Sequence, residues 1–501
     1  MFSDGTGQAG GILVDEHRSN VYKLFRATRC GPDSEIDPDK QLAFYDPGLG
    51  SASAGEDIKV GFLRKIYNGL SSATGLGITK NIIDCYAALI HLWRPGDRIF
   101  LFGFSRGAYT VRCLGGVLGL CGIPTRLPNG RPLLRDPDTV RAIAREAVVR
   151  VYRHGSGADD RVRAAAKADK GQQREKQEAV ERKGRLHEQR QALGRQFRDR
   201  YHSSGQHGAN VVPYFIGVWD TVAAVGIAPP AAAIMKWISW AGLLIAAAGI
   251  AWWAVGQISL SFLLWFVAAA AGLVALVSVM YFGLRVKFVT GLPGYKWYET
   301  LHLISFKMAF FDRSLNPNVR YARHALAIDE YRADFDRVPW ENHGAPPERE
   351  LGEGEWFEQI WFAGNHSDVG GSYPENESRL SDLALEWMVE EAKKAGLLVD
   401  ERYLRLYGRH TGQQHDECRA ELSFLGLKLR WRKHTRKIAR NATLHPSVLR
   451  RFHEPSVLIY DEEMPYRPSS LADHKELREV YLQEAIAAQA IGGAKQAERA
   501  A

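Results

Sequence analysis

Short apolar runs that end in polar or glycine-rich turns recur along this chain, and several lead into segments with helical spacing. Three of these runs span residues 98–103, 211–219 and 356–362. Apolar side chains recur at helical spacing over 77–93 and again from 381 to a glycine at 396. This alternation is typical of a parallel sheet covered by helices. We therefore predict an α/β fold, similar to the α/β-hydrolases, with a mostly parallel sheet flanked by helices.

The most apolar stretch covers residues 237–284 and contains no charged side chain. Its two halves, 237–256 and 260–282, are each long enough to cross ~30 Å of hydrocarbon at about 1.5 Å per residue. Basic residues flank both outer ends, which favours the cytoplasmic side for these ends. We predict a transmembrane helical hairpin over 231–288, in a two-pass protein of the inner membrane with a cytoplasmic catalytic domain. The alternative is a buried or oligomer-forming helical pair.

Composition divides the rest of the chain into further segments. Residues 155–205 are rich in Lys, Arg, Glu and Gln, which predicts a charged insertion on the surface. The alanine-rich end, 491–501, is predicted to be a disordered tail. The hydrolase domain would then consist of an N-terminal half (1–154), a strand that carries an acid (206–230) and a C-terminal part (289–490).

The overall composition excludes several classes of protein. With 46% hydrophobic and 24% charged residues, the chain is expected to be folded. The formal net charge is +8, but no groove-reading motif is present, so we do not expect a nucleic-acid partner. The five cysteines form no CxxC pair and predict neither a disulfide framework nor a zinc site. No secretory signal peptide is apparent.

Residues 103–107 match the pattern G-x-S-x-G, with Ser105 at its centre. The pattern lies between an apolar strand and a helix, which is the context that a nucleophile elbow requires. The glycines allow the backbone to bend sharply, so that the serine oxygen projects above the edge of the sheet. We expect Ser105 to be the nucleophile and the backbone N–H of Arg106 to be one oxyanion donor.

A serine nucleophile needs a base, and the base needs an acid that orients it. Asp220 ends an apolar strand, and His366 follows another strand in a glycine-rich loop. The order serine, acid, histidine is that of the α/β-hydrolases. Asp368 is a second candidate for the acid, although we favour a role in shaping the loop around His366.

A glycine-rich turn follows almost directly after the first residue, with little of a strand before it. A backbone N–H of Gly5 or Thr6 could be the second oxyanion donor, because glycine permits close approach. A simple turn is the alternative. Asp4, like Asp368, is a candidate for an alternative acid or a loop-shaping residue.

Taken together, these motifs resemble the DUF2235 family of α/β-hydrolases, which includes the type 1 lipase effectors of the type VI secretion system. The matching segments are D-G-T (4–6), Y-D-x-G-x-G (45–50), G-F-S-R-G-A (103–108), G-V-W-D-T-V (217–222), R-H-A-L-A-I-D-E (323–330), W-F-x-G-x-H-S-D-V-G-G (361–371) and H-P-S-V (445–448). The resemblance implies a Ser105–Asp220–His366 triad and ester hydrolysis, with phospholipid as the substrate class of the secreted members.

We therefore expect a membrane-associated serine esterase or lipase that needs no metal or organic cofactor. Its expected partners are a lipid or ester substrate and a membrane. One alternative is a secreted antibacterial effector that acts at the membrane of a target cell and has secretion-spike and immunity proteins as partners. The other alternative is a non-catalytic membrane scaffold that retains the fold.

Overall fold

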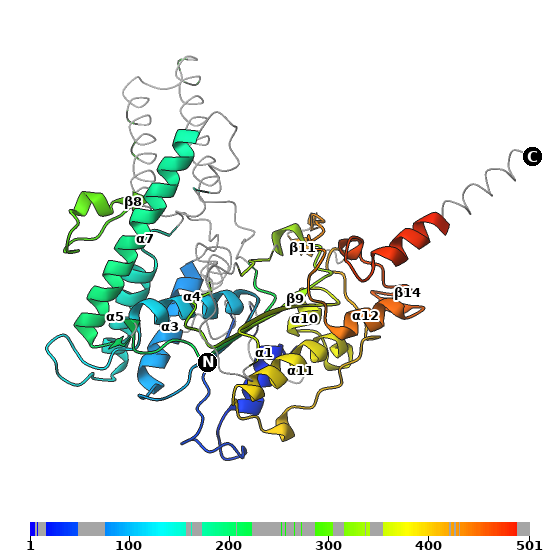
Figure 1. Cartoon of the computed structure of the whole chain (residues 1–501), viewed down its shortest axis with the longest axis horizontal. Helices are drawn as coiled ribbons and strands as arrows, with labels where there is room; N and C mark the ends of the chain where they lie inside the picture. Colours follow the sequence, from blue (N-terminus) through cyan, green and yellow to red (C-terminus); the bar gives the residue numbers. More distant parts are fainter. Residues whose placement is uncertain are drawn as a thin grey trace, which may run out of the picture.

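A six-stranded parallel sheet forms the centre of the computed structural model (Figure 1). The strands lie in the order β10-β9-β6-β3-β1-β2, and every neighbouring pair is parallel. Their bounds are β1 (Phe2–Ser3), β2 (Tyr45–Asp46), β3 (Phe100–Phe104), β6 (Phe215–Trp219), β9 (Tyr321–Ala327) and β10 (Phe357–Phe362). The sheet confirms the predicted α/β class, and β1 is as short as the sequence indicates.

The structure describes residues 1–5, 8, 17–48, 76–156, 162, 173–206, 208–222, 252, 256, 265, 272, 286–303, 315–335, 337–340, 354–419, 422–424, 427–429 and 431–487. The predicted tail at 491–501 lies outside them, as does nearly all of the predicted hairpin. Among the residues just given, no helix combines the length and apolar character needed to cross a membrane. The hairpin therefore stays a prediction.

Helices cover both faces of the sheet because successive strand residues point in opposite directions. Leu101 of β3 packs into one core, with α3 (Leu76–Leu92) and α4 (Ser105–Cys121). Phe102 packs into the other, with α1 (Asn20–Thr28) and α11 (Arg379–Lys394). The first core also contains α5 (Pro137–Arg145) and η2 (Glu146–Tyr152).

The chain beyond α11 forms a third apolar cluster against the end of β9 and β10. It contains Val448 and Phe452 of α12 (Pro446–His453), together with Leu326 and Trp361 of the central sheet. In Figure 1 this C-terminal part lies on the right, next to α10 and β9. The C-terminal part thus shares an apolar core with the sheet.

The remaining elements are short. They are β4 (Ser204–Gly205), β5 (Gly208–Ala209), β7 (Val286–Lys287), η3 (Trp297–Thr300), β8 (His302–Leu303), η4 (Ala333–Phe335), α10 (His366–Gly370), η5 (Glu375–Glu377), η6 (Glu401–Tyr403), β11 (Leu422–Phe424), β12 (Leu427–Leu429), β13 (Val457–Ile459), β14 (Glu462–Met464) and η7 (Ser469–Leu471). The two-stranded sheets pair β4 with β5, β7 with β8, β11 with β12 and β13 with β14, all antiparallel.

The charged segment at 155–205 is more closely tied to the core than its composition predicts. Most of it forms α7 (Gln173–Tyr201), which packs against α4 and η2 (Figure 1). Leu193 and Phe197 on one face of its second half are buried, whereas Val180 in the first half is 55% exposed. The spacing of the buried apolar residues in the second half is helical, and that signal was present in the sequence.

We predict that Leu193→Ala lowers the free energy of unfolding by about 3 kcal/mol, because it leaves a cavity in the core between α7 and α4. Val180→Ala is the matched control on the same helix and should change the unfolding free energy by less than about 0.5 kcal/mol. Urea denaturation of both variants measures the difference. Equal effects of the two substitutions would show that α7 does not contribute to the core.

Candidate active site

Ser105, Asp220 and His366 lie at one edge of the sheet because parallel strands all end on the same side. Ser105 follows β3, Asp220 follows β6 and His366 comes shortly after β10. Asp4 follows β1 and Glu330 follows β9 at the same edge. The strand order reverses between β1 and β3, and such a switch point is where open α/β sheets bind ligands.

Ser105 lies in the sharp turn between β3 and α4. Its φ angle is 57°, a left-handed conformation that is strained for a residue other than glycine. A Cβ at Gly103 would lie 2.6 Å from the carbonyl oxygen of Gly107, and one at Gly107 would lie 2.0 Å from that of Ser3. Both glycines are therefore required for α4 to pack closely against β3 and β1. Ser105 is 7% exposed.

The first turn of α4 points its amide groups toward the same edge of the sheet. The N-cap residue of α4 is Phe104, which has no side chain that can accept a hydrogen bond from these amides. Burial lowers the pKa of the Arg106 guanidinium to about 10. The start of α4 is thus a site where backbone donors can stabilise negative charge.

Asp220 and His366 are in direct contact, although 146 positions separate them in the sequence. Nδ1 of His366 lies 2.5 Å from Oδ2 of Asp220. Burial by itself would raise the pKa of Asp220, but the neighbouring charge of Arg436 and the hydrogen bond from His366 hold that pKa below its usual value. An ionised carboxylate can only accept, so Nδ1 of His366 carries the proton of this hydrogen bond.

Aromatic rings enclose the His366 imidazole. The Phe104 ring centroid lies 4.6 Å from it, and the Phe335 ring meets it edge-on at 5.3 Å. Because Phe104 directly precedes Ser105, this contact places His366 next to the turn that holds Ser105. The backbone N–H of His366 donates to Oε2 of Glu330 over 3.2 Å.

The segment around His366 is helical, which corrects the prediction of a loop. His366 is the first residue of the single-turn helix α10. The side chain of Asn365 caps this turn by accepting from the backbone N–H groups of Ser367 and Asp368. A Cβ at Gly370 would lie 1.9 Å from the Phe104 ring, so glycine is needed where α10 packs against the elbow.

The model for the catalytic domain of Tle1-like phospholipase effectors of type VI secretion systems matches residues 1–248 and 285–391. This chain belongs to the Tle1-like family. The family resemblance seen in the motifs is thereby confirmed. Membership supports a lipase-type hydrolase and fits the secreted alternative, whereas it does not support the predicted two-pass location in the inner membrane.

Two further similarities cover smaller parts of known proteins. An uncharacterised protein of Saccharomyces cerevisiae is 34% identical over 110 residues, which is 21% of this chain and 15% of the yeast protein. A crystal structure of an uncharacterised protein from Pseudomonas aeruginosa aligns with 79% of this chain and 46% of its own, at 17% identity and a TM-score of 0.32. This Tle1-like chain thus spans less than half the length of either protein.

The boundaries of the family match bear on two features of this Tle1-like chain. The unmatched interval, 249–284, falls within the uncharged apolar stretch and contains the whole second span of the predicted hairpin, whereas most of the first span lies inside the match. Ser105, Asp220 and His366 all lie inside the match, and the chain beyond 391 lies outside it.

Asp4 organises the turn after β1. Its carboxylate accepts from the hydroxyls of Ser19 and Tyr45, each over 2.6 Å, and from the N–H of Gly5 over 2.7 Å. The Gly5 N–H is thus engaged by Asp4, which disfavours its predicted role as an oxyanion donor. Thr6, the other predicted oxyanion donor in this turn, lies outside the described residues.

Asp368 holds a different histidine. Its carboxylate accepts from Nδ1 of His415 over 2.7 Å and from the N–H groups of His415 and Asn365. His366 donates to Asp220 instead. This arrangement favours the loop-shaping role that we preferred for Asp368.

Two charged residues of this edge were missed by the sequence reasoning. Arg436 donates to both oxygens of Asp220, and Glu330 accepts from the N–H of His366 while it is paired with Arg332. Glu330 belongs to the quoted R-H-A-L-A-I-D-E block, so its motif was a usable signal. Nothing in the local sequence around Arg436 indicates its partner.

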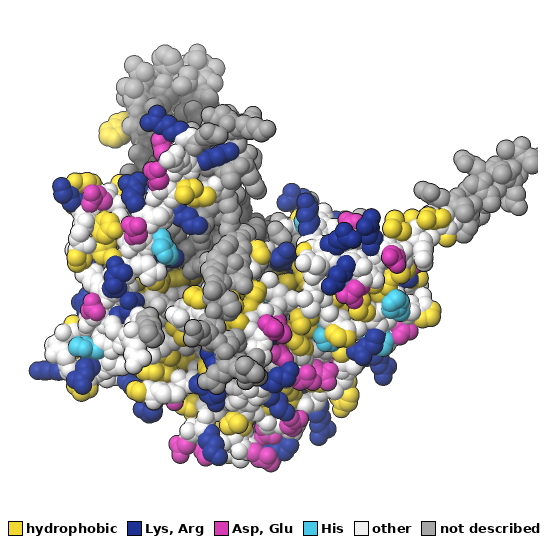
Figure 2. Space-filling model, viewed as in Figure 1, with side chains coloured by type: hydrophobic (Ala, Val, Ile, Leu, Met, Phe, Trp, Pro, Cys, Tyr) yellow, Lys and Arg dark blue, Asp and Glu magenta, His cyan; other side chains and the backbone are white. Residues whose placement is uncertain are grey.

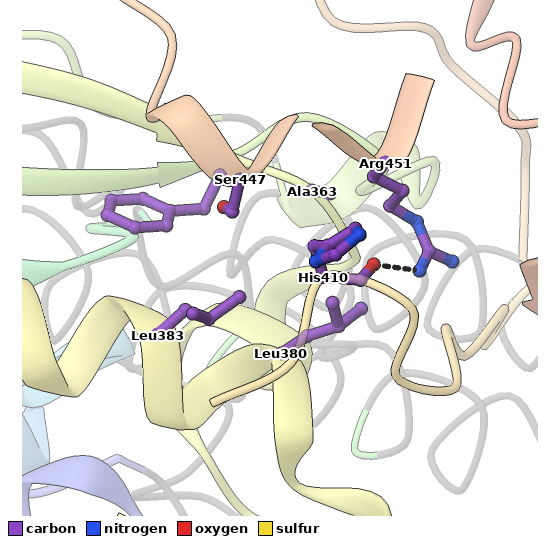
Figure 3. A pocket seen from close by; sticks show the side chains of 7 residues that line it. Ala363, Leu380, Leu383, His410, Ser447 and Arg451 are labelled. Atoms are coloured by element: carbon purple, nitrogen blue, oxygen red, sulfur yellow. Dashed lines mark hydrogen bonds between the residues drawn. The ribbon is translucent and has the colours of Figure 1, made fainter. Parts of the chain in front are cut away.

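Other surfaces of the described residues offer less to a ligand. A narrow gap between α11 and α12, too small to admit a water molecule, is lined by Leu380, Leu383 and Arg451 among others (Figure 3). It lies beside the hydrogen bond that Arg451 donates to the carbonyl oxygen of His410. On the face in Figure 2, basic and acidic side chains of the described residues are interspersed. No group of three metal-ligating side chains occurs among these residues.

Asp46, next to the Asp4 turn, predicts a pH dependence of stability. It accepts from the Ser3 hydroxyl over 2.8 Å and from Asn81 over 3.1 Å, and burial raises its pKa to about 7. Its usual pKa is about 3.9. Since the folded state binds this proton more tightly, the stabilisation is complete below about pH 4 and is lost as the pH rises through about 7.

Asp46→Asn should remove this dependence. Relative to the variant, the unaltered chain should lose about 2–4 kcal/mol of unfolding free energy between about pH 4 and pH 7.5. Denaturant unfolding across this range measures the difference between the two chains. Two stability profiles that run parallel would contradict a raised pKa at Asp46.

Proposed function

We propose that this Tle1-like chain is a serine hydrolase that cleaves carboxylic esters of phospholipids through an acyl-enzyme. The observation that carries the proposal is the buried hydrogen bond between His366 and Asp220, placed beside the strained elbow that holds Ser105. Membership of a phospholipase effector family supports phospholipid as the substrate class.

In the proposed reaction, Oγ of Ser105 attacks the ester carbonyl and its proton passes to Nε2 of His366. The tetrahedral intermediate collapses as the same proton moves to the departing alcohol, which leaves the acyl group on the serine. His366 then deprotonates a water molecule, which attacks the acyl-enzyme. The carboxylic acid departs and Ser105 regains its proton. Asp220 orients the imidazole and stabilises the imidazolium that forms in each step.

The oxyanion of both tetrahedral intermediates would be stabilised at the start of α4. The backbone N–H of Arg106 follows the nucleophile, which is the usual place for one donor in α/β-hydrolases. The helix dipole adds partial positive charge at the same point. Thr6 is the remaining candidate for a second donor, since the Gly5 N–H is bound to Asp4.

A secreted effector is the cellular role that the family favours. Such a protein would be delivered with a secretion-spike protein, act at the membrane of a target cell and be neutralised by an immunity protein. The predicted apolar hairpin would then contact the target membrane instead of anchoring the enzyme in its own cell. A non-catalytic scaffold is disfavoured by the intact Asp220–His366 pair.

An exposed aromatic cluster supports contact with a membrane. It consists of Phe288, Trp297, Tyr298 and Leu301, which lie next to the β7–β8 pair and expose between 45% and 56% of their surface. The cluster directly follows the apolar stretch in the chain, and Nζ of Lys296 lies 5.8 Å from the Tyr298 ring centroid. Aromatic rings beside lysines are typical of the membrane–water interface.

Substitution of the proposed triad tests the chemistry. Ser105→Ala should abolish labelling by a fluorophosphonate probe, and His366→Ala should lower both labelling and phospholipid hydrolysis by about 10³-fold or more, because no group then accepts the serine proton. Circular dichroism of each variant controls for folding. Unchanged turnover in a folded Ser105→Ala variant would sink the proposal.

Substitution of the aromatic cluster tests the membrane contact. A Trp297→Ala/Tyr298→Ala variant should bind vesicles of phosphatidylcholine and phosphatidylglycerol about tenfold more weakly in sedimentation assays, because two interfacial anchors are lost. Tyr407→Ala is the control, since Tyr407 is 62% exposed on a segment after α11. An equal loss in both variants would contradict a specific contact by the cluster.

A further inference from the structure

Arg436 lies well beyond the family match, which ends at residue 391, and yet it contacts the proposed catalytic acid. Its Nη1 is 2.6 Å from Oδ1 of Asp220, and its Nη2 is 3.0 Å from Oδ2. The Arg436 side chain is 2% exposed and that of Asp220 is fully buried. The pair therefore interacts where water does not screen the charges.

Backbone pairing delivers Arg436 to this position. The segment before it lies antiparallel to the chain that leaves β9, with Lys433 opposite Arg332. The N–H of His434 donates to the carbonyl oxygen of Tyr331 over 2.7 Å. This pairing fixes the direction from which the Arg436 side chain enters the edge of the sheet.

Two backbone carbonyl groups also hold the guanidinium of Arg436. Nη1 donates to the carbonyl oxygen of Ala327 over 2.9 Å, and Nη2 donates to that of Phe335 over 2.8 Å. Phe335 also packs against the His366 ring. The planar fork is thus fixed by two carbonyl groups while it binds both oxygens of Asp220, which leaves the carboxylate a single orientation.

We propose that Arg436 is a positioning residue of the ester-hydrolysing site, and that it acts by keeping Asp220 charged and aimed at His366. The inference rests on the proposed function, because it assigns Arg436 a part in the same reaction. It also makes the chain beyond residue 391 a part of the catalytic apparatus, where the family's catalytic-domain match has already ended.

The other charged and titratable groups around the pair leave Arg436 as the principal counter-charge of Asp220. Burial lowers the pKa of His324 to about 3, so this neighbour of Asp220 is neutral at pH 7. Glu330 accepts the backbone N–H of His366, and its own charge is balanced by Arg332 at 2.7 Å. A change of charge at Arg436 therefore acts on the Asp220–His366 pair directly and also on Glu330, whose principal counter-charge is Arg332.

Arg436→Gln separates a catalytic effect from a purely structural one. Loss of a buried positive charge raises the proton affinity of the Asp220–His366 pair. The pH midpoint of the fluorophosphonate labelling rate should rise by about one to two pH units, and the plateau rate should fall by about tenfold or more. The full-length chain is used throughout.

Two control variants separate charge, geometry and folding. Arg436→Lys keeps the positive charge but lacks the planar guanidinium that binds both oxygens of Asp220. The pH midpoint of its labelling rate should therefore stay within a few tenths of a pH unit, while the plateau rate falls. Arg451→Gln removes an equally buried arginine that donates to the carbonyl oxygens of His410 and Gly412 over 2.7 and 2.8 Å. It should lower stability and leave the midpoint unchanged.

A measurement that does not depend on catalysis tests the role of Arg436 separately from the proposed hydrolase activity. In a Ser105→Ala chain with 15N-labelled histidine, the NMR titration of His366 should move upward by about one to two pH units when Arg436→Gln is added. An unmoved titration in the folded double variant overturns the role of Arg436. Absence of fluorophosphonate labelling in the unaltered folded chain overturns the proposed hydrolase instead, and the positioning role in catalysis falls with it.

Discussion

The buried charge of Asp220 is the constraint on which the rest of this site depends. A carboxylate without any exposed surface is strongly unfavourable unless other groups compensate its charge. Arg436, Nδ1 of His366 and the N–H of Ala327 together supply four hydrogen bonds to its two oxygens. These hydrogen bonds offset the free-energy cost of burying the carboxylate. They also fix its orientation relative to the imidazole of His366.

The parallel sheet meets the second requirement of the site, which is that residues from different strands lie close together. Ser105, Asp220 and His366 each follow a different strand, and only a common strand direction brings these strand ends to one edge. The backbone is strained at two of these ends, since φ is 57° at Ser105 and 36° at Asp220. Such strain persists where the surrounding structure holds it, and here close packing at Gly103, Gly107 and Gly370 does so.

The site also draws on parts of the chain that look peripheral in sequence. The third apolar cluster, around α12, anchors the C-terminal part against β9 and β10. From that part come Arg436, which binds Asp220, and His415, which binds Asp368 and thereby braces the turn that begins with His366. Two aspartates near one histidine thus have separate partners, and the hydrogen bonds distinguish their roles.

The sequence alone determined the sheet class, the elbow at Ser105 and the candidates Asp220 and His366, because each depends on a local pattern of strand, turn and glycine. It also contained the helical stripe of α7 and the block that includes Glu330. Tertiary structure decided that Asp220 and not Asp368 meets His366, that the Gly5 N–H is taken up by Asp4, and that Arg436 completes the site. The pairings of Asp220 and Asp368 join residues far apart in the chain, and all of these hydrogen bonds depend on burial and direction, which no local pattern encodes.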